Sequence, residues 1–429
     1  MARPHPQPVS RRKLLVHSLA SLGDQALLSG LNLLLGLLLI RLASKTAYGV
    51  YSQLIVGGIF AFTILEALIT GPLTTLAPAR SDDSRARLIA HLTIFQWQVS
   101  AALALLFGVA AALLTAGADA HPLQLGAAFA IYIFANALRE YRRSIAFIEG
   151  KPHHALQIDI AYGLGLAVGI SLLVLLRQLS IPGVLLVLGL ANVLALWRGK
   201  TPIPSLSTPD AKSDYRADLR DIWRRGRWAL PGAMVAWFTN YSYLYLAALW
   251  LGVAASAELN ASRLLLMPIS LSVLAWSRVA RPMVTRLLAA GDWKNLDRLA
   301  WVSVLCIELL TVAYVAVLWW SLPWLVSHLL GSKYSGLDPL VLAWGLYFAI
   351  NAARWIGSSW LTSNDQYPLL LISGIACLLV MLAATSIVIP LYGAWGAILA
   401  LVIVEAFDFV LIWMVLLPML KRRRKGTPT

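Results

Sequence analysis

Two stretches of the sequence repeat the same polar residues at the same helical spacing. Each places a tyrosine, an asparagine and an arginine at i, i+4 and i+7: Tyr132, Asn136, Arg139 and Tyr347, Asn351, Arg354. Residues at this spacing lie on one face of a helix. The fork of donors on arginine suits anionic groups. The repeat therefore predicts two polar stripes that bind an anion.

The surroundings of these stripes indicate where they face. Both lie within apolar runs, and an arginine in hydrocarbon costs at least about 2.5–3.5 kcal/mol on insertion scales. We therefore expect the two stripes to line a shared central cavity. The alternative is that Arg139 and Arg354 snorkel to the inner headgroups. Arg142 and Arg143, nearer water, are interpreted as ordinary interface charges.

Acidic residues inside apolar runs are candidates for ion coupling. They are Asp24, Glu66, Glu308, Glu405 and Asp408. Glu405 and Asp408 share a helical face and would disturb each other's proton affinity. Such carboxylates could relay protons, coordinate Na⁺ or pair with Arg263 or Arg354. For any single one, a structural hydrogen bond or salt bridge is at least an equal alternative to a coupling role.

Two further candidates for substrate binding come from separate apolar runs. Arg263 lies inside an apolar run, and Trp237, Tyr241 and Tyr245 fall at i, i+4 and i+8 on one helical face. These rings could form a platform for sugar faces or a packing stripe.

The elements that must position these residues are membrane-spanning helices. Each apolar segment approaches the roughly 20 residues that cross a bilayer. We predict twelve spans, at 17–40, 50–72, 88–116, 122–147, 155–176, 181–197, 228–251, 256–277, 299–321, 338–359, 367–390 and 393–417. Six spans precede the basic stretch 198–227 and six follow it. The prediction is an all-α polytopic membrane protein with two pseudo-symmetric six-helix lobes, 1–226 and 227–429, around a central cavity.

Charge orients the chain. With both tails placed in the cytoplasm, 29 of the 35 Lys and Arg residues fall on the inner side, counting Arg139, Arg142 and Arg143 at the inner end of the span 122–147. This is the bias of the positive-inside rule. The net charge of +15 then favours anionic inner-leaflet lipids as partners and not nucleic acid.

The sequence lacks the residue patterns that several classes of function require. The two cysteines lie in separate apolar runs, and His153-His154 has no third ligand nearby, so we expect no metal site. Gly199-Lys200-Thr201 lacks the first glycine of a phosphate-binding loop, so we expect no ATPase and no nucleotide cofactor. No large outer loop carries catalytic acids, so we predict no enzyme and no catalytic residues.

At this level the chain resembles the multidrug/oligosaccharidyl-lipid/polysaccharide (MOP) exporter superfamily. The passage from Leu39 to Tyr51, with Arg41-Leu42 and Tyr48-Gly49, is similar to the end of that family's first helix. The passage from Arg139 to Asp159, with Gly150-Lys151-Pro152, is similar to the fourth-to-fifth helix passage of the Wzx-like flippase branch.

The resemblance implies a function and a location. It implies translocation of an undecaprenyl-diphosphate-linked oligosaccharide, a polysaccharide or O-antigen precursor, to the outer leaflet of the bacterial inner membrane by alternating access. Polysaccharide polymerase and assembly proteins would be its partners. An H⁺ or Na⁺ gradient, or consumption of the flipped lipid, would drive transport. The alternatives are an ion-coupled multidrug exporter of the MATE type and, further away, a membrane glycan polymerase or ligase.

Overall fold

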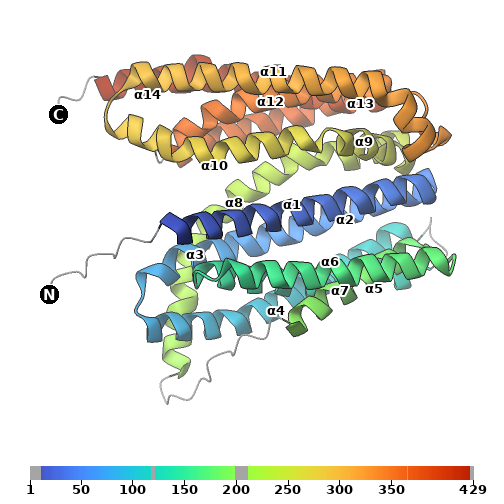
Figure 1. Ribbon diagram of the computed structural model, residues 1–429, viewed down its shortest axis with the longest axis horizontal. Coiled ribbons are helices and arrows are strands. Elements are labelled where there is room, and N and C mark those ends of the chain that lie inside the picture. The colour runs from blue at the N-terminus through green and yellow to red at the C-terminus, as the bar shows by residue number, and fades with distance from the viewer. Residues whose placement is uncertain (1–10, 117–120, 199–210, 365, 426–429) are drawn as a thin grey trace. The chain divides into compact units, whose positions relative to one another are not determined.

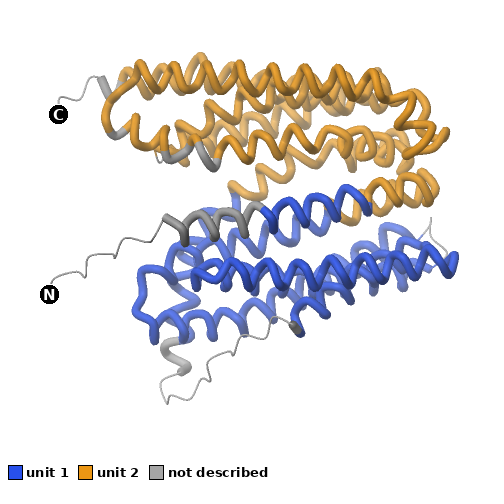
Figure 2. The backbone as a smooth tube through the Cα atoms, in the orientation of Figure 1, with its two compact units in different colours: residues 1–35, 57–231 blue, residues 36–56, 232–429 orange. Residues whose placement is uncertain are grey.

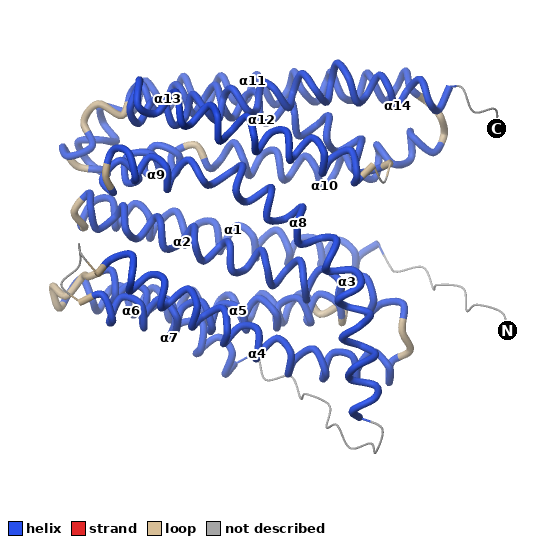
Figure 3. The backbone as a smooth tube through the Cα atoms, turned by 180° about the vertical axis from the view of Figure 1, so that it is seen from behind, coloured by secondary structure: helices blue, strands red, loops and turns tan. Residues whose placement is uncertain are grey.

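The computed structural model describes residues 11–116, 121–198, 211–364 and 366–425, with only the backbone in a few helical stretches. The described residues form helices and short loops and contain no strand (Figure 3). This confirms the predicted all-α class. The central part of the predicted inner linker, 199–210, lies outside the described residues, as does Gly199-Lys200-Thr201.

Up to Leu251, the described residues form eight α-helices (Figure 1). They are α1 (Arg11–Leu42), α2 (Lys45–Leu65), α3 (Gly71–Leu76), α4 (Asp82–Thr115), α5 (Pro122–Ile148), α6 (Pro152–Leu175), α7 (Ile181–Arg198) and α8 (Ala211–Leu251). A π-helical turn at Glu66–Thr70 joins α2 to α3, and a 3₁₀ turn at Ala77–Ala79 follows.

The second half continues in the same manner. Its helices are α9 (Val253–Leu265), α10 (Met267–Ala289), α11 (Trp293–Leu325), α12 (Asp338–Ser363), α13 (Tyr367–Val410) and α14 (Leu417–Lys425). π-helical turns cover Val326–Leu330 and Leu411–Leu416, and a 3₁₀ turn covers Ser332–Tyr334. Within α13, Gly393 adopts φ 61° and ψ −140°. This break in helical geometry separates the predicted spans 367–390 and 393–417.

Among the described residues, seven helices are long and apolar enough to cross a membrane, or eight if the bent pair Val253–Leu265 and Met267–Ser277 forms one span. The pair bends by 50° at a break, where Pro268 stands near the start of α10 and removes a backbone donor. The chain is thus a multi-pass membrane protein. The exact count of twelve spans stays a prediction.

The chain divides into two compact units (Figure 2). Unit 1 comprises 1–35 and 57–231, and unit 2 comprises 36–56 and 232–429. The division differs from the predicted lobes because residues 36–56 join the second unit. Residues 36–56 pack closely against α9 because two glycines leave room for it. A Cβ on Gly36 would lie 2.6 Å from Leu264 Cδ2, and a Cβ on Gly49 would lie 2.2 Å from the Val253 carbonyl oxygen.

Each unit has its own apolar core. In unit 1, buried side chains of α2, α4 and α5 such as Leu65, Leu88 and Tyr141 pack together with Ile222 of α8. In unit 2, side chains such as Leu296, Ile356 and Ile412 join α11, α12 and the turn after α13. These cores hold α5 and α12, which carry the two polar stripes.

Candidate functional site

The stripe on α5 is buried inside unit 1. Arg139 is 4% exposed and Asn136 is 7% exposed. An Arg139 Nη1 donates to Asp159 Oδ1 of α6 at 3.1 Å, and Nη2 donates to Asn136 Oδ1 at 3.3 Å. The guanidinium lies 4.0 Å from the centre of the Tyr162 ring. Arg139 is therefore held by partners within its own unit.

Arg143 completes this cluster. Its nitrogens lie 2.6 Å from Asp24 Oδ2, 2.6 Å from Asp159 Oδ2 and 2.5 Å from Glu140 Oε2. The Arg143 side chain is only 13% exposed. The interpretation of Arg143 as an ordinary interface charge is therefore wrong, because α5 packs against α6 and brings Asp159 to it. We call Asp24, Arg139, Glu140, Arg143 and Asp159 the unit 1 cluster.

The stripe on α12 forms a corresponding cluster in unit 2. Arg354 Nε lies 2.5 Å from Glu405 Oε2, and Nη1 lies 3.3 Å from Asp408 Oδ2. Asn351 donates to Glu405 Oε1 at 3.0 Å, and Ser373 donates to Asp408. Of the sequence alternatives for Glu405 and Asp408, the structure shows pairing with Arg354. Arg354, Glu405 and Asp408 are the unit 2 cluster.

The charges of the unit 2 cluster do not balance. Its two carboxylates are 8% and 14% exposed, and they share one guanidinium that is 15% exposed. With all three groups ionised the cluster carries one excess negative charge. In the unit 1 cluster three carboxylates face two arginines, but one of the three, Glu140, has a side chain that is 39% exposed.

The tyrosines of the two stripes pack among aromatic rings. Tyr132 contacts Phe62 and Phe129, with ring centroids 6.0 and 6.3 Å apart. Tyr347 packs edge-on against Trp344 at 5.2 Å. Both tyrosines are buried, so their rings contribute to the cores of their units.

Arg263 on α9 has surroundings of a different kind. Its Nη1 donates to the Tyr243 hydroxyl at 3.2 Å, and its guanidinium lies 5.3 Å from the Tyr241 ring centroid and 5.4 Å from that of Trp344. Within the described residues, no carboxylate forms an ion pair with Arg263. Tyr243 and Trp344, which sequence reasoning missed, come from α8 and α12, and no spacing in the sequence relates them to α9.

The aromatic stripe of α8 is anchored to α2. Trp237 Nε1 donates to the Val56 carbonyl at 3.3 Å, and the Tyr245 hydroxyl donates to the Gln53 carbonyl at 2.7 Å. Of the three rings, Tyr241 is the one that faces Arg263. These contacts support packing for Trp237 and Tyr245 and place the Tyr241 ring against the Arg263 guanidinium.

The remaining acids, Glu66 and Glu308, form no ion pair among the described residues. Glu66 is exposed within the π-helical turn after α2. Glu308 of α11 has a buried Oε1 without a hydrogen-bond partner among the described residues. No group of three or more His, Cys, Asp or Glu in the described part of the chain is arranged to hold a metal ion.

The chain has the fold of transporters of the MOP superfamily. It superimposes on an inward-facing multidrug resistance MATE family transporter with a TM-score of 0.72 and 13% identity, covering 94% of this chain and 96% of that one. It superimposes on the lipid II flippase MurJ in an inward closed conformation with a TM-score of 0.73 and 13% identity, covering 95% of this chain and 89% of that one.

A MOP superfamily transporter from Pyrococcus furiosus gives a TM-score of 0.62 at 14% identity, covering 97% of this chain and 94% of that one. The sequence matches no protein-family model and no curated protein. The structural likeness confirms the predicted resemblance to this superfamily at the level of the fold, while the Wzx-like branch stays a prediction.

Proposed function

We propose that this protein is a flippase that moves a diphosphate-linked oligosaccharide lipid from the inner to the outer leaflet of a bacterial inner membrane. The observation that carries the proposal is Arg263, an intramembrane guanidinium surrounded by aromatic rings and without a carboxylate partner in the described residues. The fold shared with the lipid II flippase MurJ supports a lipid-linked substrate.

The chemistry of Arg263 fits a diphosphate. A charge in the hydrocarbon region costs several kcal/mol, and contacts with Tyr241 and Trp344 offset only about 0.5–2 kcal/mol each. An anionic ligand would supply the missing counter-charge through charge-assisted hydrogen bonds of roughly 1.5–3 kcal/mol each. Tyr241 would offer its ring to the adjacent sugar.

Arg139 and Arg354 take a different role in this proposal. Their guanidinium groups are engaged by Asp159 and by Glu405 and Asp408, so a diphosphate would have to displace those carboxylates. We assign the two clusters to ion coupling instead. In unit 2 a proton or Na⁺ would supply the positive charge that Arg354 alone cannot, and Asp24 and Asp159 are the corresponding acids in unit 1.

The proposed cycle is alternating access. Binding of the coupling ion changes the net charge of the cluster. The conformation that contains this cluster therefore becomes more or less stable. One conformation would bind the substrate from the inner leaflet, and the other would release it to the outer leaflet. Polysaccharide polymerase and assembly proteins would then receive the flipped lipid.

Binding of undecaprenyl diphosphate to the purified protein tests the role of Arg263. Native mass spectrometry would compare the parent with Arg263→Lys and Arg263→Gln. We expect Arg263→Gln to weaken binding by roughly tenfold or more, since at least one charge-assisted hydrogen bond is lost. The affinity of Arg263→Lys should lie between those of the parent and Arg263→Gln, because lysine keeps the positive charge but lacks the forked donors of arginine.

Arg286→Gln is the matched control, since Arg286 is an exposed arginine near the end of α10. It should bind as the parent does. Equal affinity of the parent and Arg263→Gln for undecaprenyl diphosphate would overturn the assignment. Binding of organic cations in place of the diphosphate would favour a multidrug exporter.

A further inference from the structure

The first part of α8, residues 215–228, runs across the direction of α6, as Figure 1 and Figure 3 show. Its contacts follow the same course. Tyr215 packs edge-on against His91 of α4 with ring centroids 5.4 Å apart, and Arg225 Nη1 donates to Thr75 Oγ1 of α3 at 3.0 Å. Because α6 is long and apolar enough to cross the membrane, a segment transverse to it lies along the membrane surface. We call residues 215–228 the transverse segment.

One face of the transverse segment is fixed to unit 1. Asp218, Ile222 and Gly226 recur every four residues, so they share a helical face, and all three are buried. Asp218 Oδ1 lies 2.5 Å from Arg80 Nη1, and a Cβ on Gly226 would lie 3.1 Å from the Ala67 carbonyl oxygen. This close packing holds the opposite face of the helix outward.

The outward face carries arginines and tryptophans. Those that are exposed are Arg216, Arg220, Trp223, Arg224, Arg227 and Trp228. The two indole rings are 54% and 73% exposed, and the Arg227 guanidinium lies 5.4 Å from the centroid of the Trp228 ring. Water solvates an arginine well but an indole ring poorly, and tryptophan gathers at the level of lipid headgroups. Basic residues combined with tryptophan are typical of helices that lie in the membrane interface.

Charge and depth agree with that location. The acids of the segment, Asp218 and Asp221, both lie within 3.4 Å of Arg80, so the outward face keeps a net positive charge. The turn that contains Arg80 is predicted to lie on the inner side, and Trp228 is the first residue of the predicted span 228–251. The outward face is therefore expected where the chain enters the inner leaflet, whose surface is negative when it contains anionic lipids.

We propose that the outward face of the transverse segment binds the headgroups of anionic phospholipids in the inner leaflet. The arginines contact the lipid phosphates, and Trp223 and Trp228 lie among the headgroups. The net charge of the chain favours anionic lipids in general, whereas the transverse segment gives them a defined place on unit 1. This binding is separate from the translocated substrate and does not depend on the proposed flippase activity.

Native mass spectrometry of the full chain in detergent, titrated with phosphatidylglycerol or phosphatidylcholine, tests this face. The parent should bind phosphatidylglycerol roughly tenfold more tightly than phosphatidylcholine. The triple variant Arg216→Gln, Arg220→Gln, Arg227→Gln should lose most of this preference, since each basic residue at an anionic surface contributes severalfold. Trp223→Ala should weaken binding of both lipids, because the ring contacts headgroups of either charge. None of these changes touches the packed face.

A matched triple variant removes the same number of charges from unit 2. It is Arg286→Gln, Lys294→Gln, Arg298→Gln, three exposed residues around the turn between α10 and α11, which is predicted to lie on the same side of the membrane. It should keep the preference of the parent. Equal losses in the two triple variants would overturn the proposal, by showing that net charge alone attracts the lipid.

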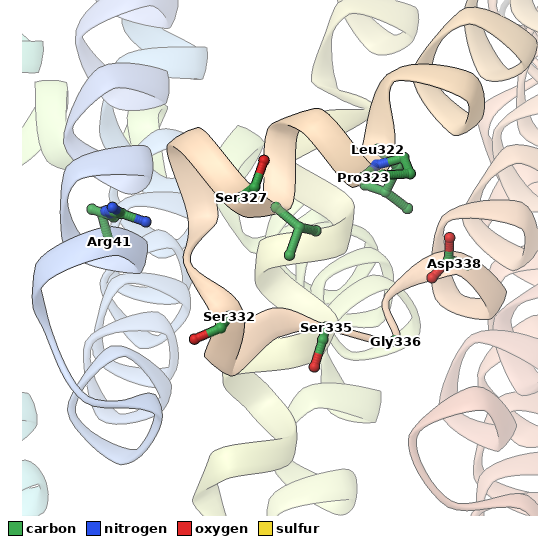
Figure 4. A pocket seen from close by; sticks show the side chains of 9 residues that line it. Arg41, Leu322, Pro323, Ser327, Ser332, Ser335, Gly336 and Asp338 are labelled. Carbon is green, nitrogen blue, oxygen red and sulfur yellow. The ribbon is translucent and has the colours of Figure 1, made fainter.

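Arg41→Gln is a second control, at the side of the membrane predicted to be the outer one. Arg41 lines a pocket of about 600 Å³ that also contains Asp338 (Figure 4), so its charge stands beside an acid and not within a basic face. This variant should bind both lipids as the parent does. Equal affinity of the parent for the two lipids would contradict the proposal, and so would displacement of phosphatidylglycerol by polyglutamate at lower concentration than by soluble glycerophosphate, which would assign the face to an acidic protein partner.

Discussion

At the scale of single residues, the two arginines of the unit 1 cluster differ in whether their removal leaves a buried carboxylate without an ion pair. Arg139→Ala leaves Asp159 paired with Arg143, whereas Arg143→Ala leaves the buried Asp24 without an ion pair among the described residues. An unpaired buried charge costs about 3–5 kcal/mol. We therefore expect Arg143→Ala to lower the free energy of unfolding more than Arg139→Ala does. Unfolding in detergent, followed by tryptophan fluorescence, measures this, and the reverse order would contradict the pairing.

The unit 2 cluster leads to a residue-scale prediction about coupling. Glu405→Gln would leave one carboxylate, Asp408, for Arg354 and so remove the excess negative charge. Transport by the reconstituted variant should lose its dependence on a proton or sodium gradient, while binding of undecaprenyl diphosphate stays within about twofold of the parent. Glu66→Gln, a change outside the cluster, should keep both properties. Gradient-driven transport by Glu405→Gln would rule out coupling at this cluster.

At the scale of elements, α8 belongs to both units, because residues up to Pro231 group with unit 1 and the remainder with unit 2. Its first part is held to unit 1 by Asp218, which lies 2.5 Å from Arg80 Nη1 and 2.7 Å from His91 Nδ1. Asp218→Ala should release this part of the helix and speed hydrogen exchange of its backbone amides over Tyr215–Arg227. Asp221→Ala should have little effect, because Asp221 is 42% exposed and 3.4 Å from Arg80. Equal protection in both variants would show that apolar contacts such as those of Ile222 hold the segment.

At the scale of the whole molecule, the distribution of basic residues predicts the topology. Reporter fusions at the turns near Gly150 and Gly291 should report the cytoplasm, and fusions near Arg177 and Ser335 should report the outer side. All four sites lie in described turns between helices. An outward signal at Gly291 would break the predicted order of spans in the second half.

Local patterns along the sequence were sufficient to predict the helical class, the membrane location and the polar stripes of α5 and α12. These features depend on hydropathy and on helical spacing, which neighbouring residues determine. Glu405 and Asp408, three residues apart on one helix, could likewise be predicted to act together. The pair Glu140 and Arg143 carries the same spacing and was the available signal for the unit 1 cluster.

Only the tertiary structure decided which charges neutralise one another. Arg143 pairs with Asp24, which is 119 residues away, and Arg354 pairs with Glu405, which is 51 residues away. Arg263 is enclosed by Tyr243 and Trp344 from two other helices. Helix periodicity states which face a residue occupies but not which helix that face meets. The roles of Arg139, Arg354 and Arg263 therefore depend on helix packing. A buried carboxylate neutralises the guanidinium beside it, whereas a guanidinium among neutral rings keeps its positive charge for a ligand.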